Sequence, residues 1–230
     1  MCEMLAVTAP LDGDPLDMAA VLEWACLMDE RGIAGYGWGI VWWQEDGLHR
    51  YRQVLGIRQD PAGLKTVSRV KTHRLMLHVR RPSLMSTISQ VDTQPYLDPE
   101  AGWAFAHNGY LERHQEFRAR YGEQLIGRSD SEVGFRMWLD TMRRGEPASA
   151  ALRSMHEQVG GQANFMALSR DGALLVYAGN VENACYRFRL GNWSVAATGL
   201  HSHDAYLFET IFPDAVGIER LGAATVLELP

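Results

Sequence analysis

The stretch Gly-Trp-Ala-Phe-Ala-His-Asn-Gly, residues 102–109, joins an apolar run to a polar end. The run 102–107 predicts a buried strand. His107-Asn108-Gly109 then predicts a tight turn, because Asn-Gly is a strong hairpin dipeptide. An Asn side-chain amide and a Gly backbone N–H on such a turn could also stabilise negative charge on an oxygen, each by about 2.7–4 kcal/mol. Both interpretations remain open at this point, and the turn alone is the more common one.

Strands are expected on both sides of this stretch, with helices mostly in the middle of the chain. Asp17 predicts a helix cap and Gly32 the end of that helix, Leu111–Tyr121 predicts a short helix, and Ser129 begins a helix with Phe135, Trp138, Leu139 and Met142 as its apolar stripe. A third middle helix covers 148–159. The other predicted strands are 2–8, 36–43, 48–56, 74–80, 163–169, 173–178, 184–190, 193–198 and 223–229. This order favours an α+β fold of two antiparallel sheets covered by helices, in one domain spanning residues 1–230.

Composition excludes several classes of function. The chain has 230 residues, a net charge of -6 and a pI of about 5.7. Nucleic-acid binding is not expected, because phosphate contacts need clustered Lys and Arg. No apolar run reaches the roughly 20 residues that span a bilayer, and the N-terminus lacks the basic region of a signal peptide. A cytoplasmic location without membrane contact is expected.

The three cysteines are Cys2, Cys26 and Cys185. An odd number without regular spacing predicts neither a disulfide framework nor a zinc site, so Cys26 and Cys185 are expected to be small buried side chains. Cys2 follows the initiator methionine, and removal of that methionine would leave a thiol and a free α-amine on one residue. An α-amine titrates near pH 7.7–8.0 and can act as a base. On position alone, a cysteine without a role is the more common interpretation.

Two polar segments supply candidate substrate ligands. Arg80, in the segment His78–Ser83, leaves a strand and could bind a carboxylate through two hydrogen bonds, with Ser83 adding a hydroxyl. A solvated strand end is the alternative. Ser129 and Glu132 predict a reciprocal capping box, which would fix the direction of Asp130 in the first helical turn.

One rival site lies near the C-terminus. His201-Ser-His203-Asp204 has spacing that could hold a metal, since His and Asp are common ligands. No other ligand group is tied to it by a motif, and a polar surface loop is the expected interpretation.

Together and in this order, these motifs resemble the class II glutamine amidotransferases, a family of N-terminal-nucleophile hydrolases, and especially their short stand-alone branch. The resemblance covers residues 1–140. It rests on Met1-Cys2, Gly37-Trp38-Gly39-Ile40, His78-Val-Arg80-Arg-Pro-Ser83, Trp103-Ala-Phe-Ala-His107-Asn108-Gly109 and Ser129-Asp130-Ser131-Glu132.

The resemblance implies a four-layer αββα sandwich and a role for each matched residue. Cys2 would be the nucleophile with its own amine as base, and Asn108 and Gly109 would form the oxyanion hole. Arg80 would bind the α-carboxylate of the substrate and Asp130 its α-ammonium, with Ser83 and His107 nearby in the substrate site. The segment Asp92-Thr93-Gln94-Pro95-Tyr96 departs from the Asn-Thr-His-Pro-Phe that is frequent in this branch.

The expected activity is hydrolysis of the γ-carboxamide of glutamine, or of a γ-glutamyl amide, through a γ-glutamyl thioester. No cofactor or metal is implied. The small-molecule substrate is the expected ligand, and an acceptor or synthase subunit is a possible partner. A free-standing γ-glutamyl peptide or amide hydrolase and a catalytically idle regulatory module are the alternatives.

Overall fold

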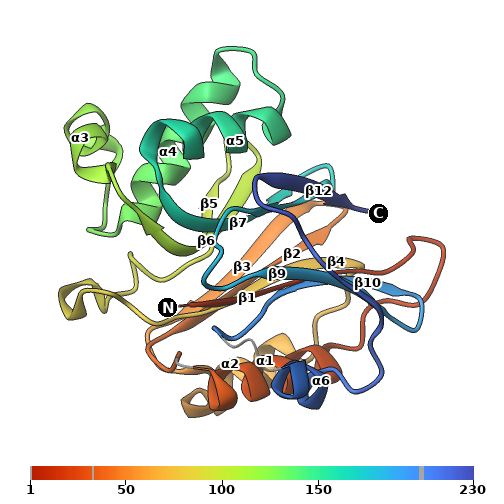
Figure 1. Ribbon diagram of the computed structural model, residues 1–230. Helices are drawn as coiled ribbons and strands as arrows, with labels where there is room; N and C mark the ends of the chain where they lie inside the picture. The colour runs from red at the N-terminus through yellow and green to blue at the C-terminus, as the bar shows by residue number, and fades with distance from the viewer. Residues whose placement is uncertain (1, 33, 202–204) are drawn as a thin grey trace.

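Two antiparallel sheets stacked on each other form the centre of the molecule, as expected (Figure 1). The computed structural model describes residues 2–32, 34–201 and 205–230. Helices cover the outer face of each sheet, so the layers follow the order αββα (Figure 1).

The larger sheet has seven strands in the order β11-β9-β10-β1-β4-β2-β3. Their bounds are Val216–Arg220 for β11, Cys185–Leu190 for β9, Trp193–Thr198 for β10, Glu3–Thr8 for β1, Arg74–Val79 for β4, Trp38–Gln44 for β2 and Gly47–Gln53 for β3. The first strand is therefore in the middle of the sheet, paired with β4 on one side and β10 on the other.

The smaller sheet has five strands in the order β12-β8-β7-β6-β5. They are Thr225–Leu229, Leu174–Ala178, Gly161–Ser169, Trp103–Leu111 and Tyr96–Asp98, in that order. The longest pairing joins β6 to β7, from Trp103 opposite Ser169 to Leu111 opposite Gly161.

The helices divide between the two outer faces. The larger sheet is covered by α1 (Met18–Arg31), α2 (Pro61–Val67) and α6 (Ala205–Ile211), and the smaller by α3 (His114–Arg118), α4 (Asp130–Arg143) and α5 (Ala148–Val159) (Figure 1). Three short 3-10 helices lie at Ile57–Gln59, Met85–Thr87 and Ala119–Gln124. Asp17 caps α1 by accepting hydrogen bonds from Ala19 and Ala20, as its sequence predicts.

The alternation of side chains along β1 explains why its sequence is apolar throughout. Leu5 and Val7 pack in the core beneath α1, whereas Met4 and Ala6 pack in the core between the two sheets. A strand that is buried on both faces needs apolar residues at nearly every position. Cys2, which precedes β1, thereby lies at the edge of the space between the sheets.

Several expectations from the sequence were wrong in detail. The sequence prediction did not include α2, α6, β5 or β11, and it ended β6 too early. Cys185 is buried as expected, while Cys26 is only partly buried.

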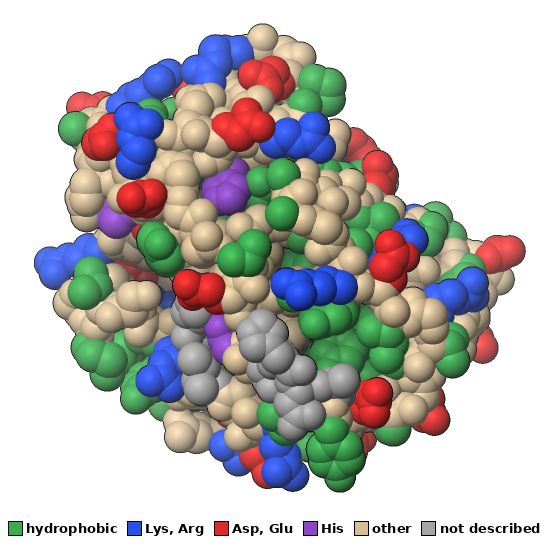
Figure 2. Space-filling model, in the orientation of Figure 1, with side chains coloured by type: hydrophobic (Ala, Val, Ile, Leu, Met, Phe, Trp, Pro, Cys, Tyr) green, Lys and Arg blue, Asp and Glu red, His purple; other side chains and the backbone are tan. Residues whose placement is uncertain are grey.

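The surface agrees with the composition. In the described part of the chain, no helix combines the length and apolar character that crossing a bilayer requires. Figure 2 shows acidic and basic side chains interspersed over one face of the molecule, without an extended basic patch on that face.

Candidate active site

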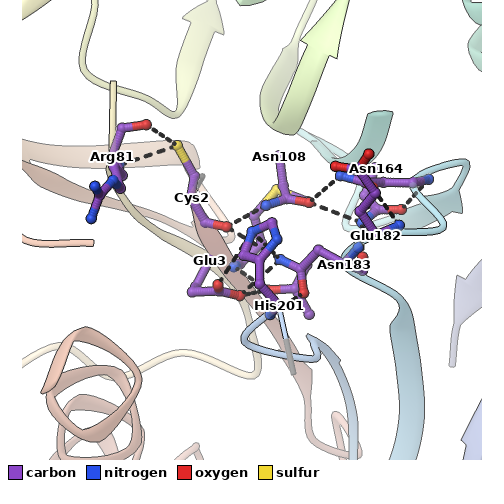
Figure 3. Close-up of polar contacts among 11 residues, drawn as sticks. Cys2, Glu3, Arg81, Asn108, Asn164, Glu182, Asn183 and His201 are labelled. Carbon is purple, nitrogen blue, oxygen red and sulfur yellow. Dashed lines mark hydrogen bonds and ion pairs between the residues drawn. The ribbon is translucent and has the colours of Figure 1, made fainter. Parts of the chain in front are cut away.

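Cys2 lines a cavity of about 340 Å³ together with five other predicted site residues. Its side chain is 9% exposed. The backbone N–H of Arg81 donates to the Cys2 sulfur at 3.3 Å, and the thiol donates to the Arg81 carbonyl at 3.5 Å (Figure 3). Burial raises the pKa of the Cys2 thiol to about 11. The thiol is therefore protonated at neutral pH and needs a base before it can attack a carbonyl.

The cavity brings together residues that are far apart in sequence. Besides Cys2, its lining includes Arg80, Ser83, His107, Gly109 and Asp130. Asn108 is the one predicted site residue that does not line it. The cavity thus lies where three parts of the chain meet, which are the segment after β4, the end of β6 and the start of α4.

Arg80 presents a buried cation to this cavity. Its side chain is 3% exposed, and one terminal nitrogen, Nη2, donates to the Thr87 hydroxyl at 2.9 Å. The other, Nη1, has no hydrogen-bond partner among the residues that the structure describes. A buried guanidinium with unpaired donors favours an anionic ligand, because a carboxylate would satisfy them. The hydroxyl in contact with Arg80 is that of Thr87, and Ser83 lines the same cavity.

Asp130 is half-buried at the first turn of α4 and lines the same cavity. Its Oδ2 accepts a hydrogen bond from the Leu111 N–H at 2.9 Å, and its Oδ1 accepts one from the Ser131 N–H at 2.8 Å. Oδ1 also accepts from the Ser131 hydroxyl at 3.3 Å, so Oδ2 is the oxygen that keeps a further lone pair for a ligand. The end of β6 therefore fixes the direction of this side chain.

The start of α4 is capped differently from the expected reciprocal box. Ser129 accepts from the Glu132 N–H as predicted, but the Glu132 carboxylate accepts from the Ile126 and Gly127 N–H groups at 2.9 and 2.8 Å instead of from Ser129. Asp92 takes the place of Glu132, because its Oδ1 accepts from the Ser129 N–H at 2.8 Å. Asp92 also accepts from the Arg128 N–H at 2.7 Å, so it ties the helix start to the loop before β5.

Asn108 and Gly109 lie within β6, and the predicted tight turn after residue 107 was wrong. They pair with Asn164 and Ala163 of β7. Gly109 has a φ of 126°, and a Cβ there would lie 1.8 Å from the Gln162 carbonyl oxygen. Asn108-Gly109 is therefore part of a distorted strand that lies very close to β7, and it does not form a turn.

The Asn108 side chain is fully buried and points toward the backbone of Cys2 (Figure 3). Its amide nitrogen donates to the Cys2 carbonyl. Its Oδ1 accepts from the side chains of Asn164 at 3.0 Å and Asn180 at 3.3 Å. These two donors fix the orientation of the amide, so that its NH₂ faces Cys2 and not the smaller sheet.

His107 and Gln94 both line the cavity and are hydrogen-bonded to each other. Gln94 accepts from the His107 N–H at 2.6 Å and donates to the Ser131 hydroxyl at 3.1 Å. His107 Nδ1 lies 2.9 Å from the same hydroxyl. Burial lowers the pKa of His107 to about 4, so the ring is neutral at pH 7.

A second polar cluster lies behind Cys2, on the side away from its sulfur (Figure 3). It contains Glu3, Asn183, Thr198 and His201. The expected surface loop was wrong for His201, whose side chain is 12% exposed. Ser202, His203 and Asp204 lie outside the described residues, and within those residues no group of three or more His, Cys, Asp and Glu side chains is placed to hold a metal.

Comparisons with known proteins agree with this architecture. A family model described as "Glutamine amidotransferases class-II" matches residues 1–194. No curated protein sequence matches the chain.

Among solved structures, glutamine phosphoribosylpyrophosphate amidotransferase from B. subtilis is similar over 99% of this chain, with a TM-score of 0.74 and 18% identity. This chain spans 47% of that protein, about half of its length. A glutamine aminotransferase class-II domain protein from Silicibacter pomeroyi has a TM-score of 0.61 and 17% identity, with 99% of this chain and 94% of that one covered. A predicted glutamine amidotransferase from Pseudomonas aeruginosa has a TM-score of 0.56 and 16% identity, with coverage of 99% and 97%.

Proposed function

Since this chain belongs to the class II glutamine amidotransferases, we propose that Cys2, exposed by removal of Met1, hydrolyses the γ-carboxamide of glutamine or of a γ-glutamyl amide. The family and the fold make amide hydrolysis the expected chemistry. The choice of substrate and the roles of individual residues are part of the proposal.

The proposed reaction has two steps. The Cys2 amine accepts the thiol proton, and the sulfur attacks the γ-carbonyl carbon. The Gly109 N–H and the Asn108 amide stabilise the resulting oxyanion, ammonia or an amine leaves with the proton from the α-ammonium, and a γ-glutamyl thioester remains. Water, deprotonated by the same amine, then releases glutamate. Because the Asn108 NH₂ already donates to the Cys2 carbonyl, its second hydrogen would have to reach the oxyanion.

The observation that carries this proposal is the unpaired nitrogen of Arg80. The guanidinium is buried in the cavity that contains Cys2, and its Nη1 has no partner among the described residues. Asp130 lines the same cavity with two carboxylate oxygens. A cation and an anion in one cavity match the α-carboxylate and α-ammonium of an amino acid, which supports a substrate with a free glutamyl end.

The test is an activity screen with protein whose mass shows that it begins at Cys2. We expect ammonia from glutamine or amine from a γ-glutamyl amide, and no turnover by Cys2→Ala. Arg80→Lys should reduce kcat/KM about 30-fold or more, since an ammonium cannot form the two-pronged contact of a guanidinium. The matched control is Arg74→Lys, at the start of the strand β4 that Arg80 directly follows.

The same screen separates the alternatives. Preference for γ-glutamyl amides over glutamine would favour a free-standing hydrolase, whereas preference for glutamine would favour supply of ammonia to an acceptor subunit. Full activity with a blocked N-terminus would contradict the mechanism. An absence of turnover on every substrate would favour the idle module.

A further inference from the structure

Glu3 is a buried carboxyl group that the proposed reaction does not use. Its side chain is 0% exposed, and it directly follows the nucleophile. Oε2 accepts hydrogen bonds from the Thr198 hydroxyl and from the Asn183 amide, the latter at 3.1 Å. Oε1 has no hydrogen-bond partner among the described residues and lies 3.7 Å from His201 Nε2. A buried carboxyl with one unpaired oxygen is costly, which suggests a function.

Asn183 links Glu3 to His201 and to the backbone of Cys2. The Asn183 oxygen accepts from the His201 N–H at 3.0 Å, which fixes the orientation of the amide. Its nitrogen then has two hydrogens but three acceptors, which are Glu3 Oε2 at 3.1 Å, His201 Nε2 at 3.0 Å and the Cys2 carbonyl at 3.4 Å. Two hydrogens cannot satisfy three acceptors. The Cys2 carbonyl already accepts from the Asn108 amide, so the two Asn183 hydrogens are available to Glu3 Oε2 and to an unprotonated His201 Nε2.

The backbone that places His201 is strained. Leu200 has a φ of 62° and His201 a φ of 54°, in the left-handed region that residues other than glycine seldom occupy. Such conformations persist where the surrounding structure holds them, and they are concentrated at functional sites. The contact between His201 and Asn183 is therefore maintained although it requires a backbone conformation that Leu200 and His201 do not favour.

Glu3 and the Cys2 sulfur lie on opposite sides of the strand. Glu3 packs against the end of α1, where a Cβ at Gly32 would lie 3.4 Å from its Cγ. The Cys2 sulfur points toward Arg81 (Figure 3). The backbone nitrogen of Cys2, which becomes the amine of the processed protein, lies directly before β1. The carboxyl group and this amine thus belong to neighbouring residues, and the sulfur lies on the opposite side of the chain from the carboxyl group (Figure 3).

The titratable groups around Glu3 are few. They are Cys2, Cys185 at the start of β9 and His201 after β10. The facing residue of β4 is Val79, which does not titrate. Burial raises the pKa of Glu3 to about 7 and that of Cys185 to about 12, and it lowers the pKa of His201 to about 4. Above pH 7 the charge of the cluster is therefore the negative charge of Glu3.

On the premise of the proposed function, we propose that Glu3 is a positioning residue, whose carboxylate stabilises the ammonium that the Cys2 amine becomes when it accepts the thiol proton. The proton moves from sulfur to nitrogen, the sulfur keeps the electron pair, and Glu3 makes and breaks no covalent bond. A nearby negative charge raises the affinity of an amine for a proton. Glu3 thereby makes the amine a stronger base for the buried thiol.

The sign of the pH dependence follows from the ionisation of Glu3. Above a pKa of about 7 the carboxylate is present and assists the amine. Below about pH 6 it is protonated, and a protonated Glu is nearly isosteric with Gln. Wild type and Glu3→Gln should therefore agree at low pH and differ at high pH.

The experiment compares the hydrolysis kinetics of wild type, Glu3→Gln and the exposed control Glu23→Gln between pH 5.5 and 8.5. We expect the wild-type kcat to exceed that of Glu3→Gln about tenfold at pH 8, the effect of a shift of about one unit in the amine pKa, and to come within about twofold of it near pH 6. KM should be unchanged, because Glu3 does not line the substrate cavity. Equal kcat values at every pH, or a loss that is the same at every pH, would contradict the proposal.

A second measurement needs no turnover and so remains valid if the proposed function fails. The rate of Cys2 alkylation by iodoacetamide reports the thiolate paired with the ammonium. It should be slower in Glu3→Gln than in wild type at pH 8 and within about twofold of the wild-type rate at pH 6. Faster alkylation of Glu3→Gln at pH 8 would mean that Glu3 acts mainly by repelling the thiolate, and this would overturn the proposal. If Glu3→Gln does not fold, Thr198→Val removes a donor to the carboxylate instead, and it should move the onset of the wild-type advantage to higher pH.

Discussion

At the scale of single residues, the three cysteines differ in what surrounds their sulfur atoms. Burial raises the pKa of Cys2 to about 11 and that of Cys185 to about 12. Cys2 lines the cavity, whereas Cys185 packs in the core between the sheets. Cys26 is half-buried on α1, distant from any predicted site residue in sequence.

We therefore expect a diazo-ketone analogue of glutamine to label Cys2 and neither of the other two cysteines. Labelling at pH 7.5 should require removal of Met1, since a thiol with a pKa of about 11 is almost entirely protonated there without an adjacent amine. Peptide mapping by mass spectrometry measures the site. A label on Cys26 or Cys185 would refute the assignment of the nucleophile.

A second prediction at this scale concerns Asp130. Asp130→Asn removes the charge proposed to hold the substrate α-ammonium, so kcat/KM on glutamine should fall by about 2–5 kcal/mol in transition-state free energy, roughly 30- to several-thousand-fold. The structure adds a smaller cost in stability, because both carboxylate oxygens accept backbone N–H groups and an amide keeps only one acceptor. We expect a loss of about 1 kcal/mol, or a decrease in Tm of about 2–4 °C.

The matched control for Asp130→Asn is Asp140→Asn, on the same helix. Asp140 forms surface ion pairs with Arg120 and Arg144, which contribute about 0–1 kcal/mol. Its substitution should leave kcat/KM unchanged. An unchanged kcat/KM for Asp130→Asn on every γ-glutamyl substrate would mean that Asp130 only holds the end of β6.

At the scale of elements, β6 shows that local sequence alone does not always predict where a strand ends. Asn108-Gly109 favours a turn by its own chemistry. Nine consecutive residue pairs with β7 override this preference and carry the strand on to Leu111. The capping box failed for a similar reason, because Asp92, which is distant in sequence, supplies the acceptor that Ser129 needs. Strands with strong apolar patterns, such as β1 and β4, were predictable because burial alone determines them.

The distorted strand leads to a prediction for Gly109→Ala. The new Cβ would meet the Gln162 carbonyl at 1.8 Å on a backbone with φ of 126°. We expect a loss of more than about 3 kcal/mol, seen as a decrease in Tm of more than about 6 °C, together with loss of activity. Circular dichroism melting and the hydrolysis assay measure the two effects.

The control Gly191→Ala separates the cost of a positive φ from the cost of the contact with the Gln162 carbonyl. Gly191 also has a positive φ, 60°, but a Cβ there meets no atom within 4 Å. It should cost only about 1 kcal/mol, with full activity. Equal losses for both variants would show that backbone conformation, and not the contact with Gln162, makes glycine necessary at position 109.

At the scale of the whole molecule, the candidate active site is assembled from both sheets. The motifs that predicted it end at residue 132, within the part of the chain where the family resemblance is clear. The supporting residues Asn164, Asn180, Asn183 and His201 come later, on β7 and in the loops after β8 and β10. Isolated asparagines in loops have no periodic or motif signal, so only the folded chain shows that they converge on Asn108 and Cys2.

The position of β1 in the middle of its sheet also has a consequence for folding. Leu5 pairs with Leu77 on one side and with Ala197 on the other. The second pairing closes a loop of nearly two hundred residues, and contacts at such separation form late and slowly. During synthesis on the ribosome, β1 cannot acquire both neighbours before β10 has emerged. Cys2, the proposed nucleophile, therefore reaches its final position only after most of the chain has been made, and the proposed catalytic site forms at the end of folding rather than at its start.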